Sequence, residues 1–372
     1  MVKVDPDLID KVRELGAFDI SACYSCGNCT AICPLSKEGQ EFPRKIIRYA
    51  VLGLREKILA SVEPWLCYYC GDCTETCPRD ADPGGFMMAV RRYLTTEYDF
   101  TGFSKALYFS KKIELLSIII LAAITGLIVY LLKGPIVPTH ADLWAFAPRH
   151  IVAWANVIVF TVLSVILIIN IYRMYKMSVG SIHFNKIPVS KYITEFIKII
   201  PLHFFTQKRR VECGEEKKYY IIHLLLFYGY AAIFLHHTIR HMLLPLIAPS
   251  IHPSELVSRI IGISAFCALI LGSSIAIYGR ITKSEIYWRN SHPTDWMFII
   301  LLWLTSITGL LTDIFVICNY PLPTYITFSV HLMFVVPLLC LEVPFAKWSH
   351  LAYRPFALYF QRLKEIALSQ AK

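Results

Sequence analysis

The sequence predicts an all-α protein in two parts, a small N-terminal domain outside the membrane and a bundle of membrane-spanning helices. Three observations predict this architecture. Only 17% of the 372 residues are charged, against about 25% in a typical soluble protein. Residues 1–112 contain fifteen of the 37 Lys and Arg residues and eight of the twelve Cys residues. From Ile113 onward, apolar runs of about the length of a bilayer span dominate.

The first domain, residues 1–112, carries its cysteines in two matching blocks. CYSCGNCTAICP runs from Cys23 to Pro34, and CYYCGDCTETCP runs from Cys67 to Pro78. Each block follows C-x2-C-x2-C-x3-C-P, which binds [4Fe–4S] clusters in two-cluster ferredoxins, with the fourth Cys of each block serving the other cluster. The predicted ligands are Cys23, Cys26, Cys29 and Cys77 for cluster one, and Cys67, Cys70, Cys73 and Cys33 for cluster two.

A pair of structural zinc sites is the alternative for these blocks. Zinc usually takes its ligands as two separated pairs, whereas each block holds four thiols within eleven residues, which favours iron–sulfur clusters. The segments FPRKIIRYAVLGLREKIL and GGFMMAVRRYLTTEY have apolar residues at helical spacing. We therefore expect a helical two-cluster ferredoxin domain. The remaining cysteines, interpreted as structural, are Cys213, Cys267, Cys318 and Cys340.

The second part is predicted to be a six-helix membrane domain over residues 113–352. Its apolar runs, each near the roughly 20 residues of a helical span, cover 115–132, 151–172, 219–245, 259–279, 296–318 and 325–348. The connection 173–218 holds ten Lys and Arg residues, and the segment from Lys347 holds five. The connections expected on the other side hold two or none.

These charges predict the orientation of the chain. By the positive-inside rule, the N-terminal domain, the loop 173–218 and the tail 353–372 should face the cytoplasm. The opening MVKVDPDLIDKVREL contains no apolar region typical of a signal peptide. We expect a multi-pass protein of the inner (cytoplasmic) membrane. The net charge of +10 is then explained by cytoplasmic loops, and no nucleic-acid partner is expected.

One stretch of the long loop, SKYITEFIKIIPLHFF, has apolar residues at helical spacing beside basic ones. This pattern predicts an amphipathic helix, and two interpretations of it stay open. It would lie on the membrane surface, or it would form a docking surface for a partner.

Histidines lie inside two of the predicted spans, where ionisable residues are costly and usually functional. The third span contains His223, His236, His237 and His241, and the sixth contains His331 and ends at His350. A single intramembrane His is more often a bonded core residue or a proton relay. Histidines at two depths on two helices favour haem b held by two axial histidines.

Depth pairs these histidines across the two helices. His331 and His237 lie about seven and eight residues from the outer ends of their spans, roughly 10 Å deep at 1.5 Å per residue. His223 and His350 both lie towards the cytoplasm. We therefore predict two haems b, with the axial pairs His223–His350 and His237–His331.

Helical phase agrees with this choice. Fourteen residues separate His223 from His237, which leaves them roughly 40° apart on a helical wheel. His236 points about 140° away and is predicted to take no part in haem binding. His241 shares the face of His223 and stays the main competing ligand.

Two resemblances follow from these segments. Residues 20–100, with CYSCGNCTAICP and WLCYYCGDCTETCPRDADP, resemble the two-cluster C subunit of heterodisulfide reductase. Residues 219–350, with HLLLFYGYAAIFLHH and HLMFVVPLLCLEVPFAKWSH, resemble the membrane cytochrome b subunit of respiratory nitrate reductase. The fusion of the two resembles the C subunits of the quinone-interacting membrane-bound oxidoreductase complexes of sulfate reducers.

The resemblance implies a subunit that transfers electrons between menaquinone and cytoplasmic partners through two haems b and two [4Fe–4S] clusters. The implied partners are two flavin-bearing, heterodisulfide-reductase-A-like subunits, with adenylylsulfate reductase as the downstream acceptor. A heterodisulfide-reductase-type subunit, or one of a sulfite-reduction complex, is the first alternative. A non-redox transporter or scaffold with a metal-bound head is the second.

A candidate quinone site lies near the outer membrane edge. Asp313 is about seventeen residues into the fifth span, roughly 25 Å along the helix, and Arg240 and His241 lie at a similar level. Quinone chemistry requires proton exchange, which a carboxyl at this depth could provide. The alternative is that Asp313 pairs with Arg240 or caps the end of its span.

Overall fold

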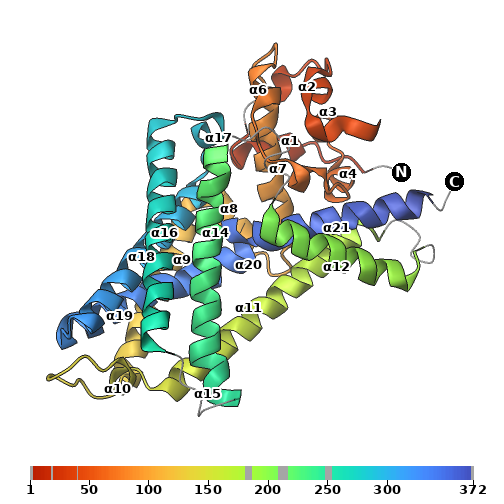
Figure 1. Ribbon diagram of the computed structural model, residues 1–372. Coiled ribbons are helices and arrows are strands. Elements are labelled where there is room, and N and C mark those ends of the chain that lie inside the picture. The colour runs from red at the N-terminus through yellow and green to blue at the C-terminus, as the bar shows by residue number, and fades with distance from the viewer. Residues whose placement is uncertain are drawn as a thin grey trace.

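Figure 1 shows the computed structural model of the protein, which describes residues 3–17, 20–39, 41–180, 187–207, 217–247 and 254–369. Helices make up the regular structure of these residues, and no β-strand occurs among them. The predicted all-α class is confirmed. Cys213 lies outside the described residues.

The N-terminal domain is built from short helices around one longer helix. The short ones are α1 (Leu8–Glu14), α2 (Asn28–Ile32), α3 (Arg44–Val51), α4 (Arg55–Leu59), α5 (Glu63–Leu66), α6 (Asp72–Glu75) and α8 (Phe103–Phe109). The longer helix is α7 (Pro83–Tyr98). Asp82 caps α7 by accepting a hydrogen bond from the backbone of Gly85, and Pro83 fits the first helical position, which has no acceptor for an N–H. Most of α7 is buried, so it is the centre of the domain.

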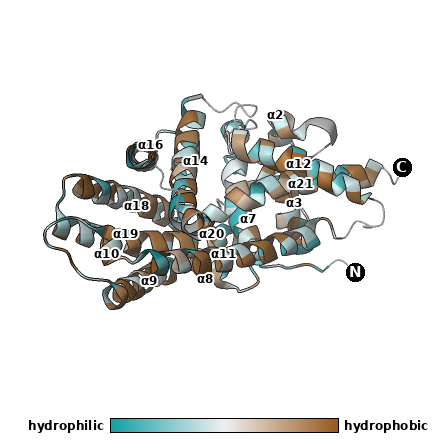
Figure 2. Ribbon diagram, turned by 60° about the horizontal axis from the view of Figure 1, so that its bottom comes forward, coloured by the Kyte–Doolittle hydropathy of each residue, from teal (hydrophilic) through white to brown (hydrophobic). Residues whose placement is uncertain are grey.

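Six helices are long and apolar enough to cross a membrane, as predicted. They are α9 (Lys111–Leu132), α11 (Arg149–Ser178), α14 (Lys217–His237), α16 (Glu255–Thr282), α18 (Pro293–Ile317) and α19 (Pro321–Pro337). Three short helices connect them: α10 (Leu143–Phe146), α15 (Leu244–Ile247) and α17 (Ile286–Arg289). Figure 2 shows hydrophobic residues covering α9, α18 and α19. Side chains such as Leu127, Ile158 and Ile260 are exposed, as a lipid-facing surface requires.

The membrane helices pack in a fixed order of neighbours. Helix α14 packs on α16, α16 on α18, α18 on α19 and α19 on α9. Helix α11 contacts α4 and α7 of the N-terminal domain, and it also contacts the C-terminal helix α21. Because α16 lies between α14 and α18, residues on those two helices face different surfaces of α16.

The sixth span ends differently from the prediction. After Pro337 the chain continues as a π-helix, η5 (Leu338–Glu342), and then as α20 (Val343–Phe345). The span therefore covers Pro321–Phe345 instead of 325–348. The backbone leaves helical geometry at Ala346, with φ −127° and ψ −142°. His350, predicted to end the sixth span, instead begins a separate helix after the 3-10 turn η6 (Lys347–Ser349).

That separate helix, α21 (His350–Ser369), belongs to the core of the N-terminal domain. Its Tyr353 ring lies 5.2 Å from the ring of Trp65 in α5 and 5.4 Å from that of Tyr98 in α7. The segment expected to be a tail thus contributes a buried helical face.

The amphipathic helix predicted in the long loop forms α12 (Val189–Thr206). It lies side by side with α21 (Figure 1). The Tyr359 hydroxyl donates to the backbone oxygen of Tyr192 at 3.1 Å, and the Phe196 ring lies 5.6 Å from the Tyr359 ring. Part of its surface therefore docks on this chain itself.

We predict that Leu363→Ala, a change on α21, lowers the free energy of unfolding by roughly 2–5 kcal/mol. Leu363 is fully buried in the N-terminal core, so its removal leaves a cavity. Thermal unfolding of the detergent-solubilised protein measures the effect. Leu368→Ala on the same helix is the matched control, because Leu368 is 59% exposed. Equal effects of the two changes would contradict the docking of α21.

Candidate redox site

The two cysteine loops have the same backbone conformation. Ser25 and Tyr69, the third residues of the two blocks, are both in the left-handed region, with φ 58° and 60°. Each backbone N–H faces the first sulfur of its own block, at 3.3 Å for Ser25 to Cys23 Sγ and 3.4 Å for Tyr69 to Cys67 Sγ. Such N–H groups stabilise negative charge on sulfur. The sequence repeat is therefore also a structural repeat.

The thiols of the first block lie near one thiol of the second block. Burial, together with three neighbouring thiols, raises the pKa of the Cys29 thiol to about 11. These neighbours are Cys23, Cys26 and Cys77. Helices α2 and α6, which follow the two loops, pack against each other and bring the blocks together.

The second group of thiols is built in the same way. Burial raises the pKa of the Cys73 thiol, and four other thiols also raise it, in order of effect Cys67, Cys70, Cys33 and, least, Cys29 of the first block. Both groups agree with the crossed pattern of ligands, although the ligand assignment itself stays a prediction. Thiols with raised pKa values hold their protons, so iron must displace those protons when it binds.

The geometry also bears on the zinc alternative. Among the described residues, no three side chains of His, Cys, Asp or Glu converge on the position of a single metal ion. A mononuclear zinc site requires such convergence, with four ligands at about 2.0–2.3 Å from the metal. The thiols of a [4Fe–4S] cluster bind four different iron atoms and are spread more widely.

The loop of the second block, called here the cluster-two loop (residues 67–73), contacts the membrane domain. The Tyr69 hydroxyl lies 3.3 Å from the backbone oxygen of Ile286 in α17. A Cβ added to Gly71 would overlap with Cγ2 of Ile286, so only glycine allows this close approach. The first block lies elsewhere, and its Cys26 is exposed. The two predicted clusters thus differ in their surroundings.

Two guanidinium groups bind the backbone oxygen of Cys67. Arg354 of α21 donates to it at 2.8 Å, and Arg91 of α7 also donates to it. The Arg354 guanidinium also lies over the Tyr68 ring, 4.3 Å from its centroid. Since Arg354 follows His350 by one helical turn, the cluster-two loop is tied directly to the start of α21.

A cavity of about 920 Å³ lies between the cluster-two loop and the membrane helices. Its walls are mainly apolar and aromatic, with residues from α7, α11, α14, α18 and α21. It also has five basic side chains, and no Asp or Glu occurs among the described residues that line it. The basic residues are Arg91, Arg92, Arg280, Lys347 and Arg354. The cavity is suited to an apolar molecule with negative groups.

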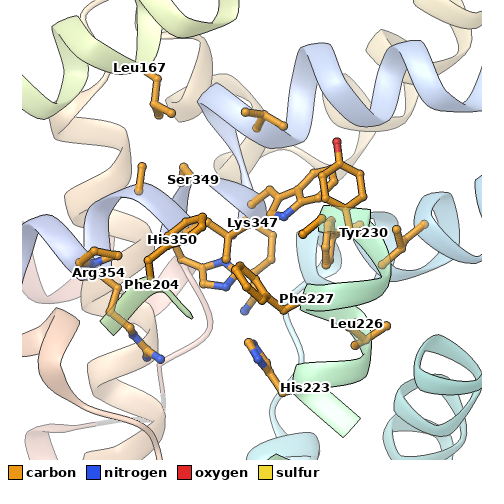
Figure 3. Close-up of a pocket in the computed structure, with 18 of the residues that line it drawn as sticks. Leu167, Phe204, His223, Leu226, Phe227, Tyr230, Lys347, Ser349, His350 and Arg354 are labelled. Carbon is orange, nitrogen blue, oxygen red and sulfur yellow. The ribbon is translucent and has the colours of Figure 1, made fainter. Parts of the chain in front are cut away.

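Two of the predicted haem ligands line this cavity together. Figure 3 shows His223 from α14 and His350 from the start of α21, with Phe227 close by. Both histidines also line a smaller hollow next to Tyr68 and Arg354. Residues 127 positions apart in the sequence therefore share one site.

The ring of His350 is held in one orientation. Its Nδ1 lies 2.5 Å from the backbone oxygen of Lys347, which assigns the proton to Nδ1. Burial lowers the pKa of His350 to about 3, so the ring is neutral at ordinary pH. The Nε2 lone pair is then available to a metal, as is usual for metal-binding histidines whose other nitrogen donates to a carbonyl.

The other predicted pair, His237 and His331, is arranged less compactly. His331 Nδ1 lies 3.0 Å from the backbone oxygen of Thr305, so its Nε2 is also available. His237 Nε2 lies 3.1 Å from Asn156 Nδ2. The two histidines interact electrostatically, but of the two only His237 lines the cavity.

The two other histidines of the third span are placed as follows. His236 is not among the described residues that line the cavity, in agreement with the phase expected for it. The side chain of His241 lies outside the described residues.

Two of the residues predicted for a quinone site, Asp313 and Arg240, do not pair with each other. Arg240 pairs with Glu255 at the start of α16, at 2.6 Å. The Asp313 carboxylate meets the same face of α16 two turns further along, where Oδ2 would lie 3.2 Å from a Cβ on Gly262. The nearest cation acting on Asp313 is Arg259. The suggested pairing of Asp313 with Arg240 is therefore not formed.

Comparison with known proteins identifies the N-terminal domain. Residues 19–81 match the family described as 4Fe-4S dicluster domain. A protein of Archaeoglobus profundus named as similar to the C subunit of heterodisulfide reductase is 43% identical over 88 residues, which are 23% of this chain and 47% of the relative. The C subunit of the H(2):CoB-CoM heterodisulfide,ferredoxin reductase of Methanothermobacter thermautotrophicus is 34% identical over 63 residues, which are 17% of this chain and 34% of the relative.

The match is restricted to part of each protein. The iron-sulfur C subunit of the CoB–CoM heterodisulfide reductase of Methanopyrus kandleri is 34% identical over 71 residues, 17% of this chain and 37% of the relative. The chain thus spans about half or less of the length of these curated relatives. No solved structure matches it. The N-terminal domain is therefore a 4Fe-4S dicluster domain similar to the C subunits of heterodisulfide reductases.

Sequence reasoning missed the basic lining of the cavity. In the reasoning from sequence, Arg280 and Lys347 were counted only as charges that orient the membrane helices. The signal was present, because ionisable residues within membrane segments usually face the interior of the bundle or a water-filled cavity. Which face of the helix carried the charge could not be known without the packing.

We expect Cys26→Ser and Cys70→Ser each to remove one of two [4Fe–4S] signals from the electron paramagnetic resonance spectrum of the reduced protein. Each thiol is predicted to hold a different cluster, so the losses should be distinct. Iron analysis of the wild type should give about eight Fe per chain. Cys267→Ser, a change at an exposed cysteine of a membrane helix, is the matched control. About two Zn per chain without iron would contradict the assignment.

Proposed function

We propose that this chain is the membrane subunit of a respiratory complex that transfers electrons between a quinone such as menaquinone and soluble iron–sulfur or flavoprotein partners. The observation that carries this proposal is the cavity at the domain junction. It is lined by three histidines, His223 and His237 of α14 and His350 of α21, and by five basic side chains, and it lies against the cluster-two loop. Electron transfer by the N-terminal domain alone would not require such a cavity inside the membrane part.

Haem b fits the residues that form this cavity. A porphyrin is apolar and carries two propionates, which match the apolar walls and three of the five basic side chains; the other two pair with Asp295. The histidines His223 and His350 would hold the iron from two helices. The volume of about 920 Å³ lies within the roughly 300–1,000 Å³ of ligand pockets.

When bound, the haems and clusters would supply a series of one-electron carriers. The chain's own residues orient them and exclude water. Lys347 fixes the ring of His350 through its backbone oxygen. Arg354 joins the cluster-two loop to the helix that carries His350, and so sets the separation of the two sites.

We assign His237 and His331 to a second haem, and Asp313 to proton exchange with the quinone beside it. Support comes from α18. Gly309 leaves room for the Phe266 ring and, next to it, for the His331 ring, since a Cβ there would overlap with Cζ of Phe266 and lie 3.1 Å from Cε1 of His331. Asp313 follows Gly309 by four residues and so lies on the same face of α18, one turn further on. Arg240 is not part of this proposal, because Glu255 already binds it.

The proposed partners are heterodisulfide-reductase-type subunits. The names of the three relatives support this class. The resemblance described above adds two flavin-bearing, A-like subunits and adenylylsulfate reductase. The exposed first block suits such a contact, because Tyr24 is 68% exposed there and has the Arg79 guanidinium 4.3 Å from its ring centroid.

A second candidate function is a heterodisulfide-reductase-type or sulfite-reduction membrane subunit that uses another lipid carrier. The similarity to the C subunits of heterodisulfide reductases favours it. Identification of the proteins that co-purify with the native chain separates the two candidates. Adenylylsulfate reductase among them supports the first.

The absorbance spectrum of the dithionite-reduced protein tests the haem proposal. We expect sharp α-bands of haem b in the wild type. His223→Ala and His350→Ala should remove the same band, because each removes one of two axial ligands. His237→Ala and His331→Ala should remove the other band. His236→Ala is the control and should keep both. Loss of a haem in His241→Ala but not in His237→Ala would reassign the outer ligand.

Asp313→Asn should slow the reduction of the haem by menaquinol analogues while leaving both haem spectra intact. The amide keeps the shape of the side chain but cannot accept the proton that a quinol releases. Stopped-flow spectroscopy measures the rate. Glu255→Gln is the control, since Glu255 is largely exposed and binds Arg240. An unchanged rate in Asp313→Asn would exclude Asp313 from the proton path.

A further inference from the structure

Two acidic side chains are buried where the membrane helices meet the N-terminal domain. Glu114 lies in the first turn of α9, and Glu342 lies at the end of the π-helix η5. Each is 1% exposed. Ile118, one turn beyond Glu114 in α9, packs in one cluster with Leu341, the residue before Glu342. The charge of Glu114 acts on the Glu342 carboxyl. Buried acids in membrane helices are rare and usually functional.

Within the part of the chain that the structure describes, neither carboxyl has a cation of its own. Among the described residues, neither oxygen of Glu114 has a hydrogen-bond partner. Glu342 accepts the backbone N–H of Lys347, at 3.1 Å. The nearby cations are bound elsewhere, because Lys347 Nζ lies 2.6 Å from Asp295 and Arg92 Nη2 lies 2.7 Å from the same carboxylate.

The charged groups on the surrounding helices do not offset the negative charge of the two glutamates. The groups that act electrostatically on the pair come from three elements. They are Tyr108 of α8, Asp295 of α18 and Lys347 of η6. Tyr108 is neutral, and Asp295 adds a third carboxylate with two cations already in place. The charge of Lys347 is directed at Asp295, so the two glutamates keep an excess of acid.

Two ionised carboxylates cannot stay buried side by side without compensation. Burying one unpaired carboxylate costs several kcal/mol, and a second negative charge beside it adds to the cost. A proton on one carboxyl removes a charge and turns an acceptor into a donor. We propose that Glu114 and Glu342 form a proton-binding site that holds one exchangeable proton at the junction of the two domains.

The site is linked to the cavity through one residue. The backbone N–H of Lys347 donates to Glu342, and the backbone oxygen of Lys347 accepts from His350 Nδ1. This part of the inference rests on the proposed function. If one electron from a quinol reached the group that His350 would hold, the added negative charge would favour protonation of the carboxyl that is still ionised, and the pair would take up that proton from water. Reoxidation would release the electron and that proton together.

Infrared difference spectroscopy of the whole protein in detergent tests the proton site. We expect a carboxylic acid C=O band that shifts in D2O in the wild type and is lost or displaced in Glu114→Gln. Gln is neutral and similar in shape, so it should preserve the packing. Glu342→Gln tests the same proton if Glu114→Gln does not assemble. Glu255→Gln is the control and should keep the band.

The redox link has a separate measurement. The midpoint potential of the haem assigned to His350 should fall as pH rises in the wild type and lose most of that dependence in Glu342→Gln. Haem α-bands without a glutamate-dependent carboxyl band would overturn the proton site alone. The carboxyl band without any haem α-band would support the proton site and overturn the proposed function. Equal pH dependence in wild type and Glu342→Gln would overturn the link to His350.

Discussion

The buried carboxylate of Asp295 joins the two parts of the protein. It lies in the first turn of α18 and accepts the backbone N–H of His292, so it helps to begin that helix. It binds Arg92 of α7 at 2.7 Å and Lys347 of η6 at 2.6 Å. Removing one member of such a buried group costs about 3–5 kcal/mol, because the remaining charges stay unpaired. The position of α7 over the membrane helices depends on this contact.

The orientation of the cysteine loops follows from the same contact. Once Arg92 is fixed, the neighbouring Arg91 reaches the backbone oxygen of Cys67, where Arg354 meets it from α21. The cluster-two loop is therefore held against the membrane helices, and the first block is left at the outer surface. One predicted cluster site therefore lies against the membrane helices, and the other lies at the surface of the N-terminal domain. Three arginines, rather than the cysteines, set this difference.

Local patterns predicted the fold well, and contacts between distant segments limited the prediction of the site. The cysteine blocks and the spans were predictable because the spacing of four cysteines within eleven residues and the length of an apolar run are local properties of the sequence. His350 was placed in a continuous span, since sequence could not show that the chain turns at Ala346. Asp313 and Arg240 were grouped by depth, but depth does not show that each has its own charged neighbour, Arg259 for Asp313 and Glu255 for Arg240. The acidic pair with Glu342 was missed because only tertiary packing brings Glu114 and Glu342 together.

The shared core of α5, α7 and α21 has a consequence for how the protein is made. Tyr353 completes the packing around Tyr98, yet it is synthesised 255 residues later. At about 5–20 residues per second, the ribosome needs tens of seconds to reach it. During that interval the emerging domain has an open apolar surface, and all six spans must enter the bilayer first. A chaperone, or delayed delivery of iron and sulfide, would protect this stage of biogenesis.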